Sequence, residues 1–218
     1  FTRNCTKDIK KAIQELKDKA ELKGLILDLR SNPGGLLNES VDIVNLFVEK
    51  GEEVVSTKGK IKSWEKSYIA ANKPLDTEVP LVVLINSSSA SASEIVSGAI
   101  QDLDRGVVIG QRSYGKGLVQ QTRKLSYNSQ LKLTVAKYYI PSGRCIQALD
   151  YSNRNKNGSV GKMPDSLMTA FQTKNGREMF DGGGINPDIV METRRVSNIV
   201  ISLFKERLFF DYATDFRF

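Results

Sequence analysis

Serine hydroxyls crowd the stretch NSSSASASEIVSGAIQD, residues 86–102, between an apolar run and a helical pattern. Such a hydroxyl can act as a nucleophile if a neighbouring base accepts its proton. The chain contains no histidine, so a serine–histidine–acid triad cannot form. Because serine–lysine pairs perform the same chemistry, a lysine is the remaining candidate for the base.

Lys116 is the best candidate for that base. A lysine working near pH 7 needs its pKa lowered by about three units from about 10.4, at a cost of about 4 kcal/mol, and only a buried, apolar or cation-repelling site does this. Most lysines stand in charged stretches, whereas Lys116 lies between glycines in SYGKGLVQQ. The alternative is a solvated turn residue, which composition alone favours.

Ser91, in the middle of the cluster, has two interpretations. Ser91 and Glu94 have the spacing of a capping box, in which both side chains satisfy free N–H groups at a helix start. A serine on a tight strand-to-helix turn can also be a nucleophile, because the helix N-terminus favours a developing oxyanion. Spacing alone favours the cap, and Ser89 and Ser93 are the next candidates for the nucleophile.

Strands alternate with helices in the parts that would hold these residues. Residues 24–30, 80–86 and 106–110 read as strands, the first two buried on both faces, and residues 94–103 as a helix. The apolar period also predicts helices over residues 6–22, with Thr6 as the cap, and 37–48. This alternation predicts an α/β architecture with right-handed crossovers.

Other segments predict antiparallel and irregular structure. A hairpin is expected around Lys58 and Gly59, and an antiparallel pair around Asn128. Residues 150–183 are rich in Asn, Gly, Lys and Ser and are expected to be irregular, and residues 196–210 are expected to form a helical tail.

Composition narrows the function classes. The net charge is +7, but lysines alternate with acidic residues near the N-terminus and no basic stripe carries aromatic residues, which argues against nucleic-acid binding. Cys5 and Cys145 lie far apart without metal-ligand spacing, so no metal or other cofactor is expected, and a disulfide between them is left open. The longest apolar runs are too short for a membrane helix. Phe1 reads as a start in mid-domain, so a signal peptide or further domains upstream are left open.

Three ordered motifs, LILDLRSNPGG, INSSSASASEIVSGAIQD and GQRSYGKGLVQ, closely resemble the core of the C-terminal processing peptidases, also called tail-specific serine proteases. The likeness continues through KYYIPSGRCIQ and GGGINPDIV and covers roughly residues 20–190. It implies an α/β fold with a Clp-protease/crotonase-like core of ββα units, an antiparallel strand pair and a C-terminal helical tail. The expected division is a catalytic core over residues 1–190 and a helical extension over 191–218.

The resemblance assigns roles by position. Ser91 matches the nucleophile, Lys116 the general base and Gln120 the residue that positions the base. The oxyanion hole is expected to combine the N–H of Ala92 with that of Gly34 or Gly35; a turn that needs positive φ is the alternative for the glycine pair. A further residue, Asp102, matches an acidic position that either takes part in catalysis or supports the loop.

The implied activity is a serine endopeptidase that cleaves protein or peptide substrates near their C-termini, without a cofactor. The family setting implies an extracytoplasmic location, as in a bacterial periplasm or cell envelope, and a homo-oligomer is left open. No stretch resembles the substrate-recognising PDZ domain of the family, so a regulatory domain of that kind is expected outside this chain. Two alternatives remain: a catalytically silent binding or scaffold module, and an acyl-thioester-binding enzyme of the crotonase type.

Overall fold

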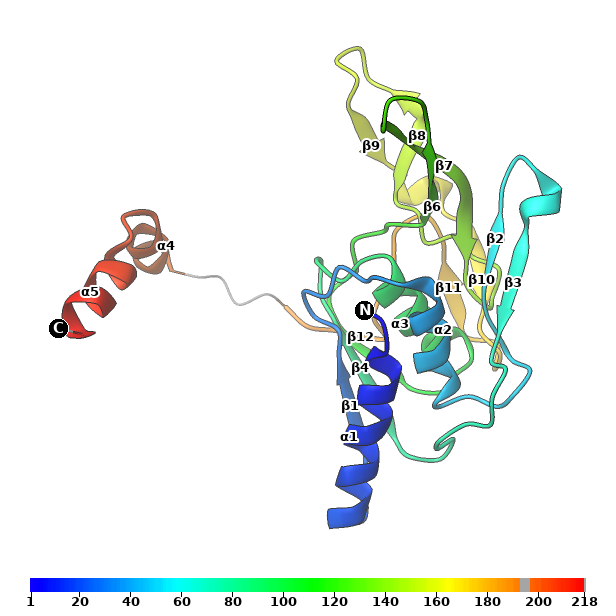
Figure 1. Ribbon diagram of the computed structural model, residues 1–218, viewed down its shortest axis with the longest axis horizontal. Helices are drawn as coiled ribbons and strands as arrows, with labels where there is room; N and C mark the ends of the chain where they lie inside the picture. Colours follow the sequence, from blue (N-terminus) through cyan, green and yellow to red (C-terminus); the bar gives the residue numbers. More distant parts are fainter. Residues whose placement is uncertain (193–196, 218) are drawn as a thin grey trace.

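A parallel sheet carries the segments around the serine cluster. The computed structural model describes residues 1–192 and 197–217, and its elements are shown in Figure 1. The sheet order is β1-β4-β5-β12, with all neighbours parallel. Its strands are β1 (Leu25–Asp28), β4 (Leu81–Ile85), β5 (Val107–Gly110) and β12 (Ile189–Val190). The α/β prediction and the three predicted strands are confirmed.

The prediction that the first strand is buried on both faces is wrong. β1 lies at the edge of the sheet, and its residues alternate between half-buried and exposed. The Ile26 side chain is 66% exposed. The continuous apolar run therefore predicted the strand correctly, but its prediction that both faces are buried was wrong.

Helix α3 lies at the centre of the protein. It covers Ala92–Asp102, and all 11 of its residues are buried. It contacts α2 (Leu37–Asn45), the parallel sheet at β5 and a second sheet at β2. Gly98 permits this packing, because a Cβ there would lie 2.8 Å from side-chain methyl carbons of both Ile140 and Ile185. The helix that follows the serine cluster is thus held on several sides.

A second, antiparallel sheet has the order β3-β2-β7-β6. Its strands are β2 (Glu53–Lys58), β3 (Lys66–Ile69), β6 (Leu118–Lys124) and β7 (Gln130–Tyr139). Both predicted antiparallel pairs are confirmed, with the 3-10 helix Lys62–Trp64 lengthening the first connection.

The prediction of irregular structure over residues 150–183 is wrong. Two short hairpins and the 3-10 helix Asp165–Leu167 occupy much of it. The hairpin strands are β8 (Leu149–Arg154), β9 (Val160–Lys162), β10 (Ala170–Gln172) and β11 (Glu178–Phe180). Most of their residues are exposed, so the sequence carries little of the apolar alternation by which strands are recognised.

Helix α1 (Cys5–Lys19) packs on α2, but its cap differs from the prediction. The N-cap is Asn4, with φ 72°, and Thr6 lies inside the helix. The Thr6 hydroxyl and N–H donate to the Glu39 carboxylate at 2.7 and 3.0 Å. Thr6 therefore attaches α1 to α2.

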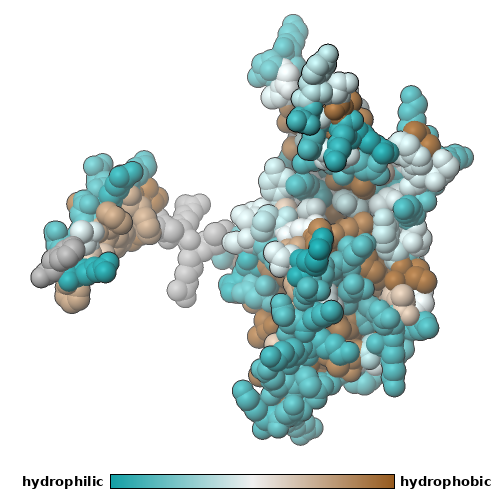
Figure 2. Space-filling model, in the orientation of Figure 1, coloured by the Kyte–Doolittle hydropathy of each residue, from teal (hydrophilic) through white to brown (hydrophobic). Residues whose placement is uncertain are grey.

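The helical tail contains two helices, α4 (Asn198–Lys205) and α5 (Leu208–Arg217), separated at Arg207, whose φ is 58°. The predicted start of the tail, Val196, lies outside the described residues. Apolar side chains gather on this pair in Figure 2, and the rings of Phe204 and Phe209 are 4.9 Å apart. Over residues 1–192 and 197–217, no helix has the length and apolar character needed to cross a bilayer.

Candidate functional site

Ser91 occupies a strained turn between β4 and α3. Its φ is 58° and its ψ is −118°, which is uncommon for any residue other than glycine. Such a conformation costs about 1–3 kcal/mol and persists only where the surrounding structure enforces it. A serine on a strained strand-to-helix turn is also the geometry of a nucleophile elbow.

The neighbouring serines have structural hydrogen bonds. The buried Ser89 hydroxyl donates to the Leu29 carbonyl at 2.7 Å. The buried Ser93 hydroxyl donates to the Asn32 carbonyl at 3.0 Å. Ser91 is only half-buried. Backbone strain and exposure therefore favour Ser91 over Ser89 and Ser93 as the reactive hydroxyl.

Glu94 connects the Ser91 turn to the Lys116 loop. Its carboxylate is fully buried and accepts four hydrogen bonds. The donors are the Ser91 N–H (2.8 Å), the Ser113 hydroxyl (2.6 Å), the Gly115 N–H (2.6 Å) and the Lys116 N–H (2.8 Å). Burial raises the pKa of the Glu94 carboxyl, against the effect of these donors. One side chain thus fixes the backbones of both candidate catalytic residues.

Gly34 lies directly against the Ser91 turn. A Cβ at Gly34 would lie 2.5 Å from the Ala90 carbonyl oxygen and 2.6 Å from the Ala92 nitrogen, and its φ is 89°, so glycine is required there. The Gly34 N–H already donates to Asn32 Oδ1 at 2.9 Å. Of the two glycines expected in an oxyanion hole, Gly34 is therefore engaged elsewhere.

The N–H groups of Ala92 and Gly35 suit an oxyanion hole better than the N–H group of Gly34. Ala92 is the first residue of α3, where an N–H has no acceptor within the helix. Among the described residues, the Gly35 N–H has no hydrogen-bond acceptor. Gly35 packs on Phe1, whose ammonium donates to the Gly34 carbonyl and whose own carbonyl accepts from Leu36 N–H at 3.0 Å.

The Lys116 loop is fixed through its backbone. A Cβ on Gly115 would lie 2.2 Å from the Ala148 side chain, and the Gly117 N–H donates to Gln147 Oε1 at 2.8 Å. The Lys116 side chain, in contrast, is exposed, and its ammonium makes no hydrogen bond or ion pair within the described part of the chain. The buried surroundings expected for a lysine base are therefore absent from residues 1–192 and 197–217.

Asp102 lies at the far end of α3 from Ser91. A helix of 11 residues is about 16 Å long, so the two side chains do not meet. Buried Arg144 donates to Asp102 Oδ1 from Nε at 3.1 Å and from Nη2 at 2.8 Å. The Ser142 N–H donates to Asp102 Oδ2 at 3.0 Å. Asp102 therefore holds the connection between β7 and β8 through these contacts.

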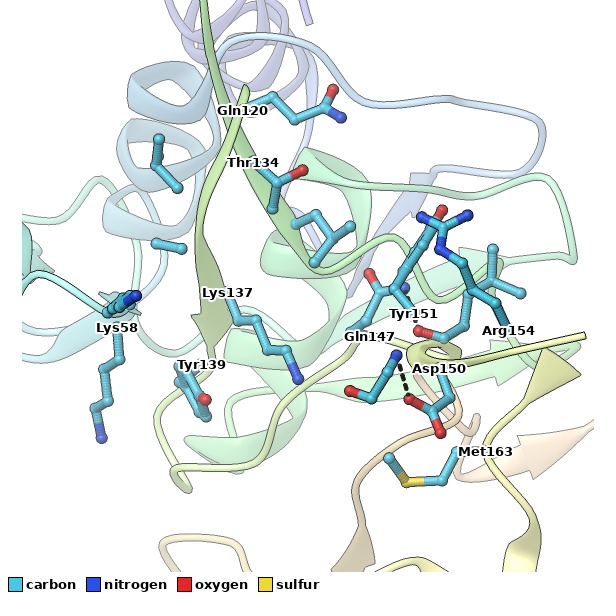
Figure 3. Close-up of a pocket in the computed structure, with 17 residues that line it drawn as sticks. Lys58, Gln120, Thr134, Lys137, Tyr139, Gln147, Asp150, Tyr151, Arg154 and Met163 are labelled. Carbon is cyan, nitrogen blue, oxygen red and sulfur yellow. Dashed lines mark hydrogen bonds between the residues drawn. The ribbon is translucent and has the colours of Figure 1, made fainter. Parts of the chain in front are cut away.

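Gln120 is exposed on β6 and lines a cavity of about 730 Å³, shown in Figure 3. Ser91 and Lys116 do not line this cavity. Within the described ranges, no cluster of three or more Cys, Asp or Glu side chains could hold a metal ion. Cys5 and Cys145 are both free thiols, so the disulfide left open by the sequence does not form.

Comparison with known proteins decides the family. Residues 1–152 match the model of peptidase family S41. The chain belongs to this family. The carboxy-terminal-processing protease of Bartonella bacilliformis is 45% identical over 152 residues, which are 68% of this chain and 35% of that protein. The carboxyl-terminal-processing protease of Synechocystis sp. is 38% identical over 168 residues, 77% of this chain and 36% of the relative. The chain thus spans about a third of the length of these curated relatives.

Solved structures agree with the family. The photosystem II D1 C-terminal processing protease superposes with a TM-score of 0.66 at 30% identity, covering 88% of this chain and 40% of that one. A putative S41 protease from Bacteroides fragilis has a TM-score of 0.60 at 13% identity, covering 88% of this chain and 43% of that one, and is similar in fold. The predicted fold class is therefore confirmed.

The sequence pattern indicates a helix cap at Glu94, but it does not indicate the contacts of Ser113 and Gln147 with the site. One signal was available for Glu94. It is an acidic residue in an otherwise apolar and small-residue helical segment, ASEIVSGAI, so a buried carboxylate with several donors could have been expected. Nothing in the sequence pairs Ser113 or Gln147 with their partners.

Proposed function

We propose that this chain carries the catalytic core of a serine endopeptidase that cleaves protein substrates near their C-termini. In it Ser91 is the nucleophile, Lys116 the general base and Gln120 the residue that positions Lys116. One observation carries the assignment of Ser91 and Lys116: the Glu94 carboxylate binds the backbone N–H groups of both, so two segments distant in sequence meet at one point.

The proposed reaction begins when neutral Lys116 accepts the proton of the Ser91 hydroxyl while Ser91 Oγ attacks the scissile carbonyl carbon. The oxyanion that forms receives hydrogen bonds from the N–H groups of Ala92 and Gly35; such donors each contribute a few kcal/mol. Protonated Lys116 then returns its proton to the leaving amine, which releases the C-terminal fragment. Water, deprotonated by Lys116, attacks the resulting ester of Ser91. Protonated Lys116 returns the proton to Ser91 Oγ as the acyl–Oγ bond breaks, which releases the N-terminal fragment and restores neutral Lys116.

The strain at Ser91 supports this role. The helix-capping function alone does not require a positive φ, since a cap normally has an extended backbone. The turn instead holds Ser91 half-buried at the start of α3, where the positive end of the helix dipole lies. Gly34, which no larger residue could replace, keeps the neighbouring backbone close to Ala92 N–H.

Lys116 needs desolvation that the described residues do not provide. A bound peptide strand lying over the Lys116 loop would exclude water from the ammonium group and favour its neutral form. We therefore propose that substrate, or protein outside this chain such as a PDZ domain, completes the surroundings of the base. An extracytoplasmic location is proposed as well, from the bacterial and chloroplast processing proteases among the relatives.

A second candidate function is a catalytically silent binding module. The Lys116 side chain favours it, because it is exposed and its ammonium has no partner among the residues that the structure describes. The family assignment leaves no observation in favour of the acyl-thioester alternative. A fluorophosphonate probe separates the two remaining candidates. Labelling confined to the Ser91 peptide, and lost in Lys116→Ala, supports the peptidase. Absence of labelling, together with absence of peptide hydrolysis, supports the silent module.

Cleavage specificity is tested with a protein library that carries the same unstructured sequence at the C-terminus or inside a loop. The proposal expects cuts near the C-terminal copies, beside small or apolar residues, and unchanged rates with a chelator present. Equal cutting of the internal copies would contradict C-terminal processing while leaving the peptidase assignment intact.

A further inference from the structure

The cavity beside Gln120 is rich in positive charge. Four cationic side chains line it, and Asp150 is its single acidic lining residue. The cations are Lys58, Lys60, Lys137 and Arg154. Hydrogen bonds from Asn153 and Ser152 lower the pKa of Asp150, so its negative charge is present at neutral pH. The cavity therefore keeps a surplus of three positive charges.

The cations have no acidic partners of their own. Within residues 1–192 and 197–217, none of the four forms an ion pair. Lys58 instead lies over the Tyr139 ring, 5.0 Å from its centre, and Arg154 lies 5.6 Å from the centre of the Tyr151 ring. Cation–aromatic contacts hold the charges in place without neutralising them.

The charges come from separate elements and surround one space. In Figure 3 the Lys137 side chain, from β7, lies between Lys58 on one side and Asp150 and Arg154 on the other. Apolar side chains, including Leu118, Leu149 and Met163, share the lining. A cavity with converging cations, aromatic rings and apolar groups fits a ligand that has both a carboxylate and an apolar body.

We propose that this basic cavity binds a carboxylate group of the peptide substrate, on the segment that extends from the cleavage site past Gln120. The proposal rests on the proposed peptidase function. Gln120 and Leu118 follow the Lys116 loop directly along β6 and line the cavity, so a peptide leaving the site along this strand reaches the cations. The carboxylate comes either from the free C-terminus or from an acidic side chain.

Binding is measured without catalysis, in Ser91→Ala protein, by fluorescence anisotropy at low ionic strength. Three labelled peptides share one sequence: a neutral peptide amide, the same peptide with a free C-terminal acid, and the amide with one internal Gln replaced by Glu. We expect the acid, the Glu peptide, or both to bind at least tenfold more tightly than the neutral amide. Which of them does so identifies the source of the carboxylate. Equal affinity of all three peptides, or no binding of any, overturns the proposal.

Substitutions of the cavity cations test whether the preference for carboxylate peptides arises in the cavity. Replacing Lys58, Lys137 and Arg154 together by Gln is expected to remove the preference, because each exposed charge contributes about two- to fivefold. A control triple variant replaces by Gln three exposed lysines outside the cavity, Lys23, Lys124 and Lys132. It has the same net charge and is expected to keep the preference. If the cavity variant fails to fold, Lys137→Gln alone is expected to reduce the preference about two- to fivefold.

Two further outcomes separate this proposal from the catalytic one. A preference that persists in the cavity variant, or is lost equally in the control, would overturn the cavity as the binding site. Raising the ionic strength from about 0.01 M to about 0.1 M shortens the screening length from about 30 to about 10 Å, so the preference must weaken with salt. Because Ser91→Ala is used, a failure of the fluorophosphonate test leaves these measurements interpretable.

Discussion

The two residues of the proposed catalytic pair share one carboxylate but lie in contrasting surroundings. Ser91 precedes a helix whose residues are all buried. Lys116 precedes β6, whose last five residues are exposed. The Ser91 backbone is strained, and the nearby Ser89 and Ser93 hydroxyls donate to backbone carbonyls. The Lys116 side chain is exposed and has no described partner.

This contrast shows which part of the site the fold prepares in advance. Close packing around α3 leaves the Ser91 turn little freedom, so the proposed nucleophile and the Ala92 N–H have fixed backbone positions without substrate. Glu94 and Gln147 fix the Lys116 backbone but not its ammonium group. The backbone position of the proposed base is therefore fixed by this chain, whereas the proposal requires its desolvation to come from substrate or another protein.

The largest effect on activity is expected from substitution of Ser91. Ser91→Ala should lower peptide hydrolysis by about 10⁴-fold or more, while changing the free energy of unfolding by about 1 kcal/mol at most. Ser91→Gly should be equally inactive but more stable than Ser91→Ala, because glycine adopts a φ of 58° without strain. Hydrolysis assays and urea unfolding check both variants. Residual turnover close to the parent would move the nucleophile to another serine.

Substitution of Lys116 tests the proposed base, whose side chain is exposed. Lys116→Arg keeps the positive charge but cannot release a proton under ordinary conditions. It should be as inactive as Lys116→Ala, with a loss of about 10³-fold or more in kcat. Substantial activity in Lys116→Arg would mean that the residue acts only as a fixed cation.

Glu94→Gln should weaken the connection between the Ser91 turn and the Lys116 loop. A Gln side chain has one acceptor oxygen and a donating amide, so two of the four N–H or O–H donors lose their acceptor. We expect kcat to fall about 10²-fold with a smaller change in KM, and a loss of about 1–3 kcal/mol in stability. Glu65→Gln, at an exposed position, is the matched control. An unchanged kcat would show that the shared carboxylate is structural only.

The pH dependence of that stability loss has a defined sign. A carboxyl group whose pKa is raised on folding favours the folded state below its unfolded pKa and loses this contribution as pH rises through the raised value. Burial raises the pKa of Glu94 from an ordinary value of 4.5. The stability advantage of the parent over Glu94→Gln should therefore be larger near pH 4 than near pH 8. Urea unfolding at both pH values checks this.

The same contrast explains what the sequence predicted well. The buried elements around Ser91 have strong apolar periodicity, so β4, β5 and α3 were predicted close to their observed bounds. The ordered motifs placed Ser91 and Lys116 in one candidate site. The roles of individual residues stay predictions until they are tested.

The sequence-based predictions fell short for segments whose structure depends on exposure to solvent or on contacts between residues distant in sequence. The polar hairpins of β8 to β11 lack apolar alternation, and Thr6 bonds a residue of another helix rather than capping its own. The capping box predicted from Ser91 and Glu94 is confirmed, since the Glu94 carboxylate accepts from the Ser91 N–H. What the spacing did not predict is that the other three donors to Glu94 come from residues 113–116. Spacing reports on neighbours in sequence and cannot reveal such distant partners.

Gln120→Ala should have the smallest effect of these substitutions, because it loosens the orientation of Lys116 without removing the base. We expect kcat to fall by about tenfold or less, with the protein as stable as the parent, since Gln120 is exposed. Gln121→Ala is the matched control: Gln121 is also exposed, but its side chain points to the opposite face of β6. A lost orienting group should also change how kcat depends on pH, whereas lost packing would not. If Gln120→Ala instead reduced kcat as severely as Lys116→Ala, activity would depend on Gln120 as much as on Lys116. The proposed role of Gln120 as a positioning residue would then have to be revised.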